Sequence, residues 1–197
     1  GDDRVIDRSL AVSRAAADHV VVVLPPGQEA EGISLMESGA ADVAVTGGSE
    51  RADSVRAALA VIDEDAAVIV VHDAARPLAS AELHQAVVAA VHAGAEAVIP
   101  AVPVTDTIKR IEHDGAGHSV VVDTLDRSTL VSVQTPQAFR AEILRDAHAT
   151  SAGATDDAAL VEAIGATVVV IDGEPTNIKI TGPNDIAIAT ILLDALG

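Results

Sequence analysis

Asp73 has the side-chain type and the position of a ligand for a metal ion or a phosphorylated substrate. It follows the apolar run Val68–Val71 within the segment Val71-His-Asp-Ala-Ala-Arg-Pro77. In open α/β sheets, ligands bind beyond the carboxyl ends of the strands. A carboxylate there suits Mg²⁺, which binds one or two carboxylates together with water and phosphate oxygens. The alternative is structural: Asp73 caps the next turn and pairs with Arg76.

A pair of glycines lies between a predicted strand and a predicted helix. Gly47 and Gly48 are followed by Ser49 to Ser54, and two glycines allow the backbone to approach a ligand closely. The first turn of the following helix offers free N–H groups that can bind an anion. A tight turn explains the same two glycines, so the pair alone does not identify a phosphate site.

Two further segments combine polar side chains with helix or strand signals. Thr155-Asp156-Asp157 precedes the helical stretch 158–164, so Thr155 is predicted to be its N-cap. The segment Asn177–Thr181 is predicted to be a short strand with Lys179 directed inward beside isoleucines. Capping explains the first segment, and a lysine that extends along an apolar surface explains the second.

Short apolar runs alternate with helical spacing along the chain. The helical spacing is clear at Leu83/Val87/Val91 and at Val55/Leu59/Ile62. The predicted strands are 20–24, 43–46, 68–72, 97–102 and 167–171. Because the runs 20–24 and 68–71 are apolar at every position, we expect helices to cover both of their faces. The sequence therefore predicts an α/β fold with a doubly wound, mostly parallel sheet.

The segment 103–133 interrupts this alternation. Residues 107–111 and 119–123 are predicted to pair as a β-hairpin around a glycine-containing turn at 114–117. A two-stranded hairpin is only marginally stable alone, so we expect this arm to pack on a partner subunit. The whole of 1–197 is predicted to be a single domain that carries the arm. Arg127 and Thr135-Pro136-Gln137 are predicted to lie in loops.

Composition narrows the possible partners. The 197 residues include 12 basic and 30 acidic side chains, which gives a formal charge of −18. A field of that sign repels nucleic acid and anionic membranes, so neither is an expected partner. No cysteine is present, no basic stretch leads an apolar one at the N-terminus, and the apolar runs are shorter than a membrane span. These features predict a soluble, cytoplasmic protein.

Five segments together resemble one enzyme family. The segments are Val71-His-Asp-Ala-Ala-Arg-Pro77, Pro103-Val-Thr-Asp-Thr-Ile-Lys109, Gln134-Thr-Pro-Gln137, Thr155-Asp-Asp157 and Asn177-Ile-Lys-Ile-Thr181. Their order and spacing resemble those of the 2-C-methyl-D-erythritol 4-phosphate cytidylyltransferase family, of the non-mevalonate isoprenoid pathway, over essentially the whole chain. The resemblance implies a Rossmann-like nucleotidyltransferase fold and a homodimer. It also implies that CTP and methylerythritol phosphate react, with Mg²⁺, to give the CDP-linked alcohol and pyrophosphate.

The resemblance also implies roles for individual residues. Asp73 would hold the metal and meet the acceptor, and Asp73, Lys179 and Arg127 would be the catalytic set. Arg127 would reach from the arm into the site of the other subunit. The nucleotide side would be lined by Gly48, Ser54, Ala74 and Arg76. The sugar phosphate would be bound by Asp73, Thr107, Arg127, Thr135, Thr155 and Lys179.

The resemblance has one large departure at the N-terminus. The family begins with a strand and a glycine-rich loop that wraps the triphosphate, whereas Gly1–Ile6 matches the segment after that loop. The chain as printed is therefore expected to bind nucleoside triphosphate weakly. Because that strand lies in the middle of the sheet, the strands 20–24 and 68–71 are expected to lack a neighbour between them.

Two alternative functions remain open on the sequence. One is cytidylyl transfer to another polyol phosphate, such as ribitol 5-phosphate, because the same threonines and Arg127 would bind either phosphate. The other is a non-catalytic dimeric scaffold of the same fold. The joint presence of Asp73, Arg127, Thr155 and Lys179 favours an enzyme, since a scaffold does not need that set.

Overall fold

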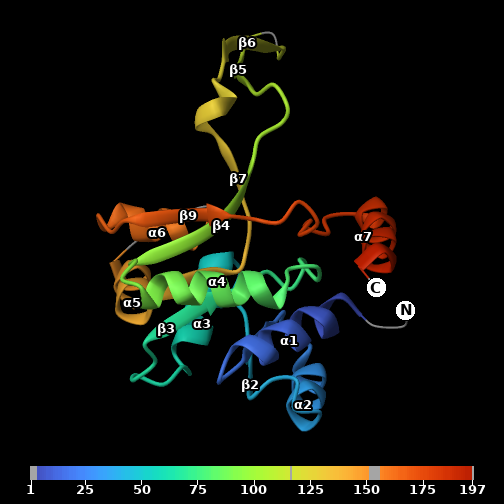
Figure 1. The fold of residues 1–197 in the computed structure, drawn as a ribbon, viewed down its shortest axis with the longest axis vertical. Coiled ribbons are helices and arrows are strands. Elements are labelled where there is room, and N and C mark those ends of the chain that lie inside the picture. Colours follow the sequence, from blue (N-terminus) through green and yellow to red (C-terminus); the bar gives the residue numbers. More distant parts are fainter. Residues whose placement is uncertain (1–3, 116, 151–155, 197) are drawn as a thin grey trace.

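The chain alternates strands and helices, as its apolar spacing predicts, in a computed structural model that describes residues 4–115, 117–150 and 156–196 (Figure 1). The helices are α1 (Val5–Ala16), α2 (Glu29–Glu37), α3 (Arg51–Leu59), α4 (Ala81–His92), α5 (Ala141–Thr150), α6 (Asp157–Ala163) and α7 (Pro183–Leu196), with a 3₁₀ turn η1 (Arg127–Thr129). The strands are β1 (Val21–Leu24), β2 (Val43–Thr46), β3 (Val68–Val71), β4 (Ala97–Pro103), β5 (Lys109–His113), β6 (Ser119–Thr124), β7 (Val131–Val133), β8 (Gln137–Arg140) and β9 (Val168–Asp172).

The larger sheet is mixed. Its order is β3-β8-β4-β7, and β9 pairs with the other edge of β4. Since β8 runs antiparallel to both β3 and β4, these two strands share a direction, and β9 is parallel to β4. The five predicted strands are present within about two residues of their predicted ends. The strands β7 and β8 were not predicted, and Gln137, the first residue of β8, was predicted to lie in a loop. In β8 only Ala138 and Phe139 are apolar, between Gln137 and Arg140, which is too short a pattern to indicate a strand.

Helices cover both faces of the larger sheet, as the doubly wound prediction requires. Ala97 and Phe139 belong to the core cluster with residues of α5 and α6. Their strand neighbours Val98 and Ala138 belong to a second cluster with Val87 of α4. This alternation follows from the two-residue period of a strand. The spacing that predicted the third helix was wrong at one end, because Ile62 lies beyond the end of α3.

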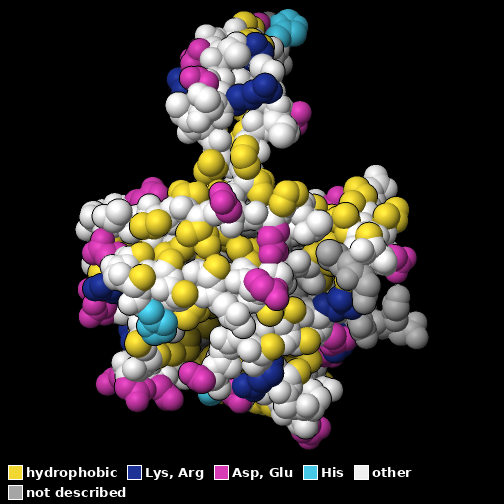
Figure 2. Space-filling model, in the orientation of Figure 1, with side chains coloured by type: hydrophobic (Ala, Val, Ile, Leu, Met, Phe, Trp, Pro, Cys, Tyr) yellow, Lys and Arg dark blue, Asp and Glu magenta, His cyan; other side chains and the backbone are white. Residues whose placement is uncertain are grey.

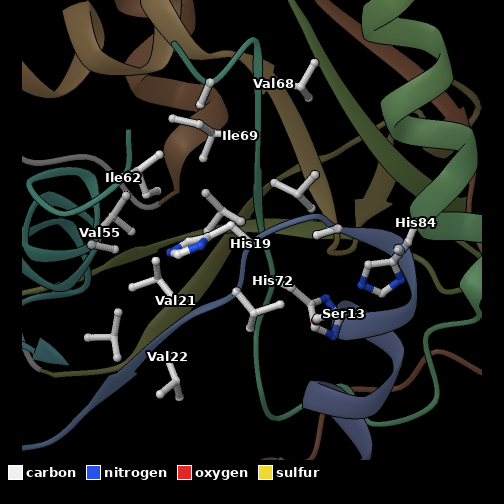
Figure 3. A pocket seen from close by; sticks show the side chains of 18 of the residues that line it. Ser13, His19, Val21, Val22, Val55, Ile62, Val68, Ile69, His72 and His84 are labelled. Atoms are coloured by element: carbon white, nitrogen blue, oxygen red, sulfur yellow. The ribbon is translucent and has the colours of Figure 1, made fainter. Parts of the chain in front are cut away.

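A second, smaller sheet consists of β1 and β2 in parallel register, and a cavity separates it from β3. In the described residues, β1 has no strand partner besides β2, and β3 has none besides β8. The cavity measures about 690 Å³ and both strands line it. Figure 3 shows apolar side chains of β1, α3 and β3 around it, with Ser13, His72 and His84 grouped at one side.

This gap corrects the expectation that the two all-apolar runs are covered on both faces. Val22 and Leu24 are buried, whereas Val21 and Val23, which also line the cavity, are only half-buried. In β3 only Ile69 is fully buried. The arrangement matches the expectation for two strands without a neighbour between them.

The hairpin projects from the base formed by β4 and β7 (Figure 1). As predicted, β5 and β6 pair antiparallel, with one irregularity between Arg110 and Ile111. All residues of both strands are exposed. In the part of the chain that the structure describes, no helix has the length and apolar character needed to cross a membrane.

Candidate functional site

Asp73 lies directly beyond the carboxyl end of β3, and three basic side chains surround its carboxylate. Lys179 Nζ donates a hydrogen bond of 2.8 Å to Asp73 Oδ2. Arg76 Nε lies 3.9 Å from the same oxygen, and Arg51 Nε lies 4.0 Å from Oδ1. These residues come from separate segments, and Lys179 is 106 positions away from Asp73 in the sequence. In a chain with a formal charge of −18, this is a local concentration of positive charge.

The cations keep Asp73 ionised. Burial disfavours its charged form, but the hydrogen bond from Lys179 and the charges of Lys179, Arg51 and Arg76 outweigh burial and hold the pKa of Asp73 below its ordinary value. The side chain of Asp73 remains 20% exposed. An anionic carboxylate is therefore available at the surface for a metal ion or a polar substrate group.

Lys179 is positioned by a loop and not by a strand. The predicted strand at Asn177–Thr181 is wrong, since the structure assigns no strand there. Instead, the Ile180 N–H donates to Ala75 O at 2.8 Å, and Arg76 Nη1 donates to Asn177 O at 2.8 Å. Two loops are joined by these bonds, which place Lys179 over Asp73.

The guanidinium of Arg76 is used in the bonds that join these loops. In addition to Asn177 O, its Nη2 donates to Val133 O at 3.4 Å, at the base of the arm. Only 13% of its side chain is exposed. Its place among the nucleotide-binding residues therefore stays a prediction. As the resemblance implied, Arg76 would act by supporting the loop.

Thr135 fixes the backbone of Asp73 through its hydroxyl. Thr135 Oγ1 accepts a hydrogen bond of 3.0 Å from Asp73 N–H and donates one of 3.0 Å to His72 Nδ1. His72 then donates from Nε2 to Arg76 O at 3.2 Å. With Thr135 as the donor to Nδ1, the imidazole is neutral and carries its proton on Nε2. Burial, followed by the nearby His84, lowers the pKa of His72 to about 4, which keeps the ring neutral at neutral pH.

Thr135 is itself only 5% exposed. It lies next to the cis Thr135–Pro136 peptide bond, and Asn177 Nδ2 donates to its carbonyl at 2.9 Å. The sequence did not indicate that Thr135 and His72 would bond, because 63 positions separate them. The assignment of Thr135 to the acceptor stays a prediction.

The glycine pair packs against its own helix. A Cβ at Gly48 would lie 2.2 Å from Asp53 Cβ, and one at Gly47 would lie 2.6 Å from Ser54 Oγ. Both positions therefore exclude a side chain whether or not a ligand is present. Ser54 and the exposed Ala74 border the cavity, together with Asp73. The predicted nucleotide-side residues Ser54 and Ala74 thus lie at one opening.

The start of α6 corrects one prediction. Its N-cap is Asp156, whose side chain accepts from the Ala159 N–H at 2.9 Å, and not Thr155. Thr155 lies outside the described residues, so its predicted role in binding the sugar phosphate stays a prediction.

Sequence reasoning missed two residues of the site, Arg51 and Asp157. Arg51 Nη1 forms a 2.6 Å ion pair with the fully buried carboxylate of Asp157. The available signal for Arg51 was its position in the first turn after the glycine pair. Asp157 belongs to the segment Thr155-Asp-Asp157 that contributes to the resemblance, but only helix initiation was expected there and Asp157 itself was given no role.

Thr107 and Arg127 lie on the arm and contact neither Asp73 nor Lys179. Both are exposed, and Arg127 Nη1 donates to Thr105 O within the same arm. Figure 1 shows the arm extending away from the body of the molecule. Within one chain, the structure therefore brings Asp73, Lys179, Thr135 and Arg76 together but leaves the two arm residues apart.

A metal ion at this site would have few protein ligands. Within the described ranges, there is no group of three or more His, Cys, Asp or Glu side chains that could hold one. Asp73 is the carboxylate available, which fits Mg²⁺ when water and phosphate oxygens supply the remaining ligands.

Comparisons with known proteins point to one family. The model of the family described as IspD: 2-C-methyl-D-erythritol 4-phosphate cytidylyltransferase matches residues 1–195. The chain is 50% identical over 180 residues to the 2-C-methyl-D-erythritol 4-phosphate cytidylyltransferase of Rhodococcus jostii, covering 91% of this chain and 76% of that protein. It is 49% identical over 202 residues to the bifunctional enzyme IspD/IspF of Anaeromyxobacter dehalogenans, covering 99% of this chain and 51% of that protein.

Solved structures agree with the sequence relatives. The crystal structure of 2-C-methyl-D-erythritol 4-phosphate cytidylyltransferase from Thermus thermophilus superimposes with a TM-score of 0.83 at 34% identity. The match covers 98% of this chain and 91% of that one. The chain thus spans about half the length of the bifunctional relative and most of the length of the single-function structure.

Proposed function

Because the chain belongs to the 2-C-methyl-D-erythritol 4-phosphate cytidylyltransferase family, we propose that it transfers a cytidylyl group from CTP to 2-C-methyl-D-erythritol 4-phosphate, releasing pyrophosphate. The observation that carries the proposal is the 2.8 Å pair of Asp73 and Lys179, from two motifs far apart in the sequence. The Asp73 carboxylate can bind a metal ion and the Lys179 ammonium can neutralise phosphate charge. Side by side, the two groups suit a reaction between two phosphates.

The reaction asks for positioning and charge stabilisation. An oxygen of the acceptor phosphate attacks the α-phosphorus of CTP in line, and the bond to the departing pyrophosphate breaks. Negative charge spreads over the α-phosphate oxygens and the leaving group. Lys179 and Arg51, both beside Asp73, would stabilise that charge. Arg76 would act indirectly, by holding the loop of Asp73 against that of Lys179.

The fit to Mg²⁺ at Asp73 supports its use as the cofactor. The ion would neutralise phosphate charge when bound, and Asp73 Oδ1, which Lys179 does not contact, would be the protein ligand. The bonds to Thr135 fix the backbone from which that carboxylate extends. Ionisation of Asp73 near neutral pH keeps it competent to bind the cation.

The remaining residues of the proposed site divide between the two substrates. The opening of the cavity beside Ser54 and Ala74 would receive the nucleotide, with Gly48 in the adjoining turn. Thr107, Thr135, Thr155 and Arg127 would meet the sugar phosphate. Since Thr107 and Arg127 extend on the arm, they would serve the site of a second copy.

A homodimer through the arm is supported by its exposed apolar side chains. Ile111, Val120, Val121 and Val122 are between 47% and 55% exposed on a hairpin that has no core of its own, and Val131 at its base is 48% exposed. Figure 2 shows apolar side chains gathered where the arm joins the body. Exposed apolar patches of this kind indicate an interface.

The dimer is tested by light scattering coupled to size-exclusion chromatography. Val121→Glu is expected to lower the molar mass from that of two chains to that of one. Val61→Glu is the matched control, because Val61 is 40% exposed on the body and away from the arm. A monomeric unmodified chain would contradict the proposal.

The activity is tested by pyrophosphate release with CTP, Mg²⁺ and methylerythritol phosphate, against a reaction without acceptor. Acceptor-dependent release supports the proposal, and release only with ribitol 5-phosphate would reassign the acceptor. A stable dimer without release from either acceptor would favour the scaffold. A cytoplasmic location, expected from the sequence, stays a prediction.

A further inference from the structure

Asp157 is a buried carboxylate whose two oxygens have different partners. Its side chain has no exposed surface. Nε2 of His148, on α5, donates to Oδ1 at 2.9 Å, and Nη1 of Arg51 lies 2.6 Å from Oδ2. An ionised carboxylate is costly to bury unless it is paired and hydrogen-bonded. The hydrogen bond from His148 and the ion pair with Arg51 together compensate the charge, and the ion pair gives Arg51 a buried carboxylate partner.

Arg51 extends from this buried pair to Asp73. The guanidinium is planar and rigid, so an anion at one edge sets the orientation of the whole group. With Nη1 on Asp157, Nε stands 4.0 Å from Asp73 Oδ1, which is too far for a hydrogen bond. Arg51 therefore lies beside Asp73 without forming a hydrogen bond to it through Nε.

The alternative partner for Arg51 is Asp73 itself. Arginine and carboxylate form short bidentate pairs when their geometry allows. Such a pair would cover Oδ1, the oxygen that the hydrogen bond from Lys179 leaves uncovered. It would also use the donors of Arg51 that could otherwise meet a phosphate.

We propose that Asp157, supported by His148, is a positioning residue that keeps the Arg51 guanidinium next to Asp73 but off its Oδ1 oxygen. The Arg51 guanidinium then remains available to the phosphate oxygens of the substrates, and Asp73 Oδ1 remains available to the cation of the proposed function. The identity of those substrates rests on the proposed function, whereas the placement of Arg51 does not.

A double-mutant cycle in pyrophosphate release tests the route of action. Arg51→Ala, Asp157→Asn and the double variant are compared for kcat/KM of CTP. Asp157→Asn is expected to lower kcat/KM about tenfold, and the double variant is expected to match Arg51→Ala within about twofold, because coupled residues are not additive. A purely structural role would multiply the two losses and overturn the proposal.

A matched control is Val161→Ala, on the same helix as Asp157. Val161 is fully buried in the core cluster that contains Leu160 and Phe139, and its apolar side chain cannot form an ion pair with the guanidinium. The variant is expected to lower the melting temperature as Asp157→Asn does, and its effect on kcat/KM is expected to multiply with that of Arg51→Ala. If the losses in this control were also non-additive, the coupling to Arg51 would not be specific to Asp157, and the proposal would be overturned.

A second readout does not require turnover. The chain has only ten arginines, so the Nε–Hε resonance of Arg51 can be assigned by nitrogen NMR. In Asp157→Asn the resonance is expected to move downfield, as Nε forms a hydrogen bond with Asp73. Adding Asp73→Asn is expected to reverse the shift.

An unchanged Arg51 resonance in Asp157→Asn would overturn the positioning role, whatever the enzyme assay shows. Failure of the unmodified chain to release pyrophosphate, with the NMR shift present, would count against the proposed function and leave the placement of Arg51 supported.

Discussion

The loop of Asp73 and the hairpin arm hold their polar side chains in opposite ways. Around Asp73, Thr135 and Asn177 are buried and bonded to partners far along the sequence. On the arm, Arg127 and Lys109 are exposed and bond to residues of the arm itself. Buried networks fix geometry and are costly to disturb, whereas exposed bonds contribute little to stability. The network around Asp73 is complete within one chain, whereas the exposed arm fits the dimer that we propose.

The largest effect is expected from Asp73→Asn. The variant keeps the shape of the side chain but removes the charge that pairs with Lys179. Turnover is expected to fall by about 10³-fold, within the range seen when a charge-stabilising group is lost. Thermal unfolding should change little, because the carboxylate is partly exposed. Near-normal turnover would contradict the proposed role of Asp73.

The loop should also make stability depend on pH. His72 is neutral in both folded and unfolded states above pH 6.5. As pH falls from 6.5 to about 4, the unfolded chain binds a proton that the buried folded imidazole does not, so the free energy of unfolding falls. The total loss is about 3 kcal/mol, from the difference between the two pKa values. Asp73 adds to the loss only below its ordinary value of 3.8.

This pH dependence is measured by denaturant unfolding between pH 4 and 7. His72→Gln should make the profile shallower, because the titrating group facing His84, Asp73 and Arg76 is then absent. Burial also lowers the pKa of His84, so a smaller slope of the same sign should remain. His113→Gln, on the exposed arm, is the control. A profile that stays steep without His72 would assign the effect to another group.

A smaller difference is expected between two threonines. Thr135→Val removes a hydroxyl that bonds to both Asp73 and His72, and its loss leaves a buried donor and acceptor unsatisfied. The expected cost is about 1–3 kcal/mol of unfolding free energy. Thr124→Val removes the exposed bond to Lys109, and the expected cost is below about 0.5 kcal/mol. If denaturant unfolding showed an equal loss of unfolding free energy for the two variants, the contrast between the two regions would be contradicted.

The smallest effect on a single chain is expected from Arg127→Ala. Because Arg127 is exposed, stability should not change, while the KM of the acceptor should rise about tenfold and that of CTP much less. An equal rise for both substrates would mean that the arm does not reach the acceptor.

Mixed dimers sharpen this prediction. If Arg127 acts in the partner's site, a mixture of Arg127→Ala and Asp73→Asn chains contains hybrid dimers with one intact site. At low acceptor concentration the mixture should recover about a quarter of the unmodified rate, as expected for random exchange of subunits. Activity at the mean of the two variants would place Arg127 in its own chain's site.

The same contrast explains what could be predicted from sequence. The strands and the hairpin have local patterns, such as the all-apolar runs of β1 and β3, and these were predicted well. Asp73 could be found because it follows a strand. The strand β8 could not, since its residues are buried by partners on both sides and not by a local pattern.

Within the site, the wrong strand at Lys179 and the missed pair of Arg51 and Asp157 have one physical cause, whereas the capping error is a local shift of one residue. The strand predicted around Lys179 is a loop, because its geometry comes from single bonds to Ala75 and Arg76. The capping role predicted for Thr155 belongs to Asp156, one residue later. The pair of Arg51 and Asp157 joins two helix starts that lie far apart in the sequence. The local spacing of residues does not predict these long-range contacts.

The cavity between β1 and β3 also lies between two separate apolar cores. The core of β1, α1 and α2 is a separate cluster around Leu24 and Leu35, and no described strand bonds it to the larger sheet. Local opening can therefore expose the amides of Val21–Leu24 to solvent while those of β4 and β8 stay protected. Amide hydrogen exchange in this chain should thus report two levels of protection, with their boundary along the cavity and close to Asp73.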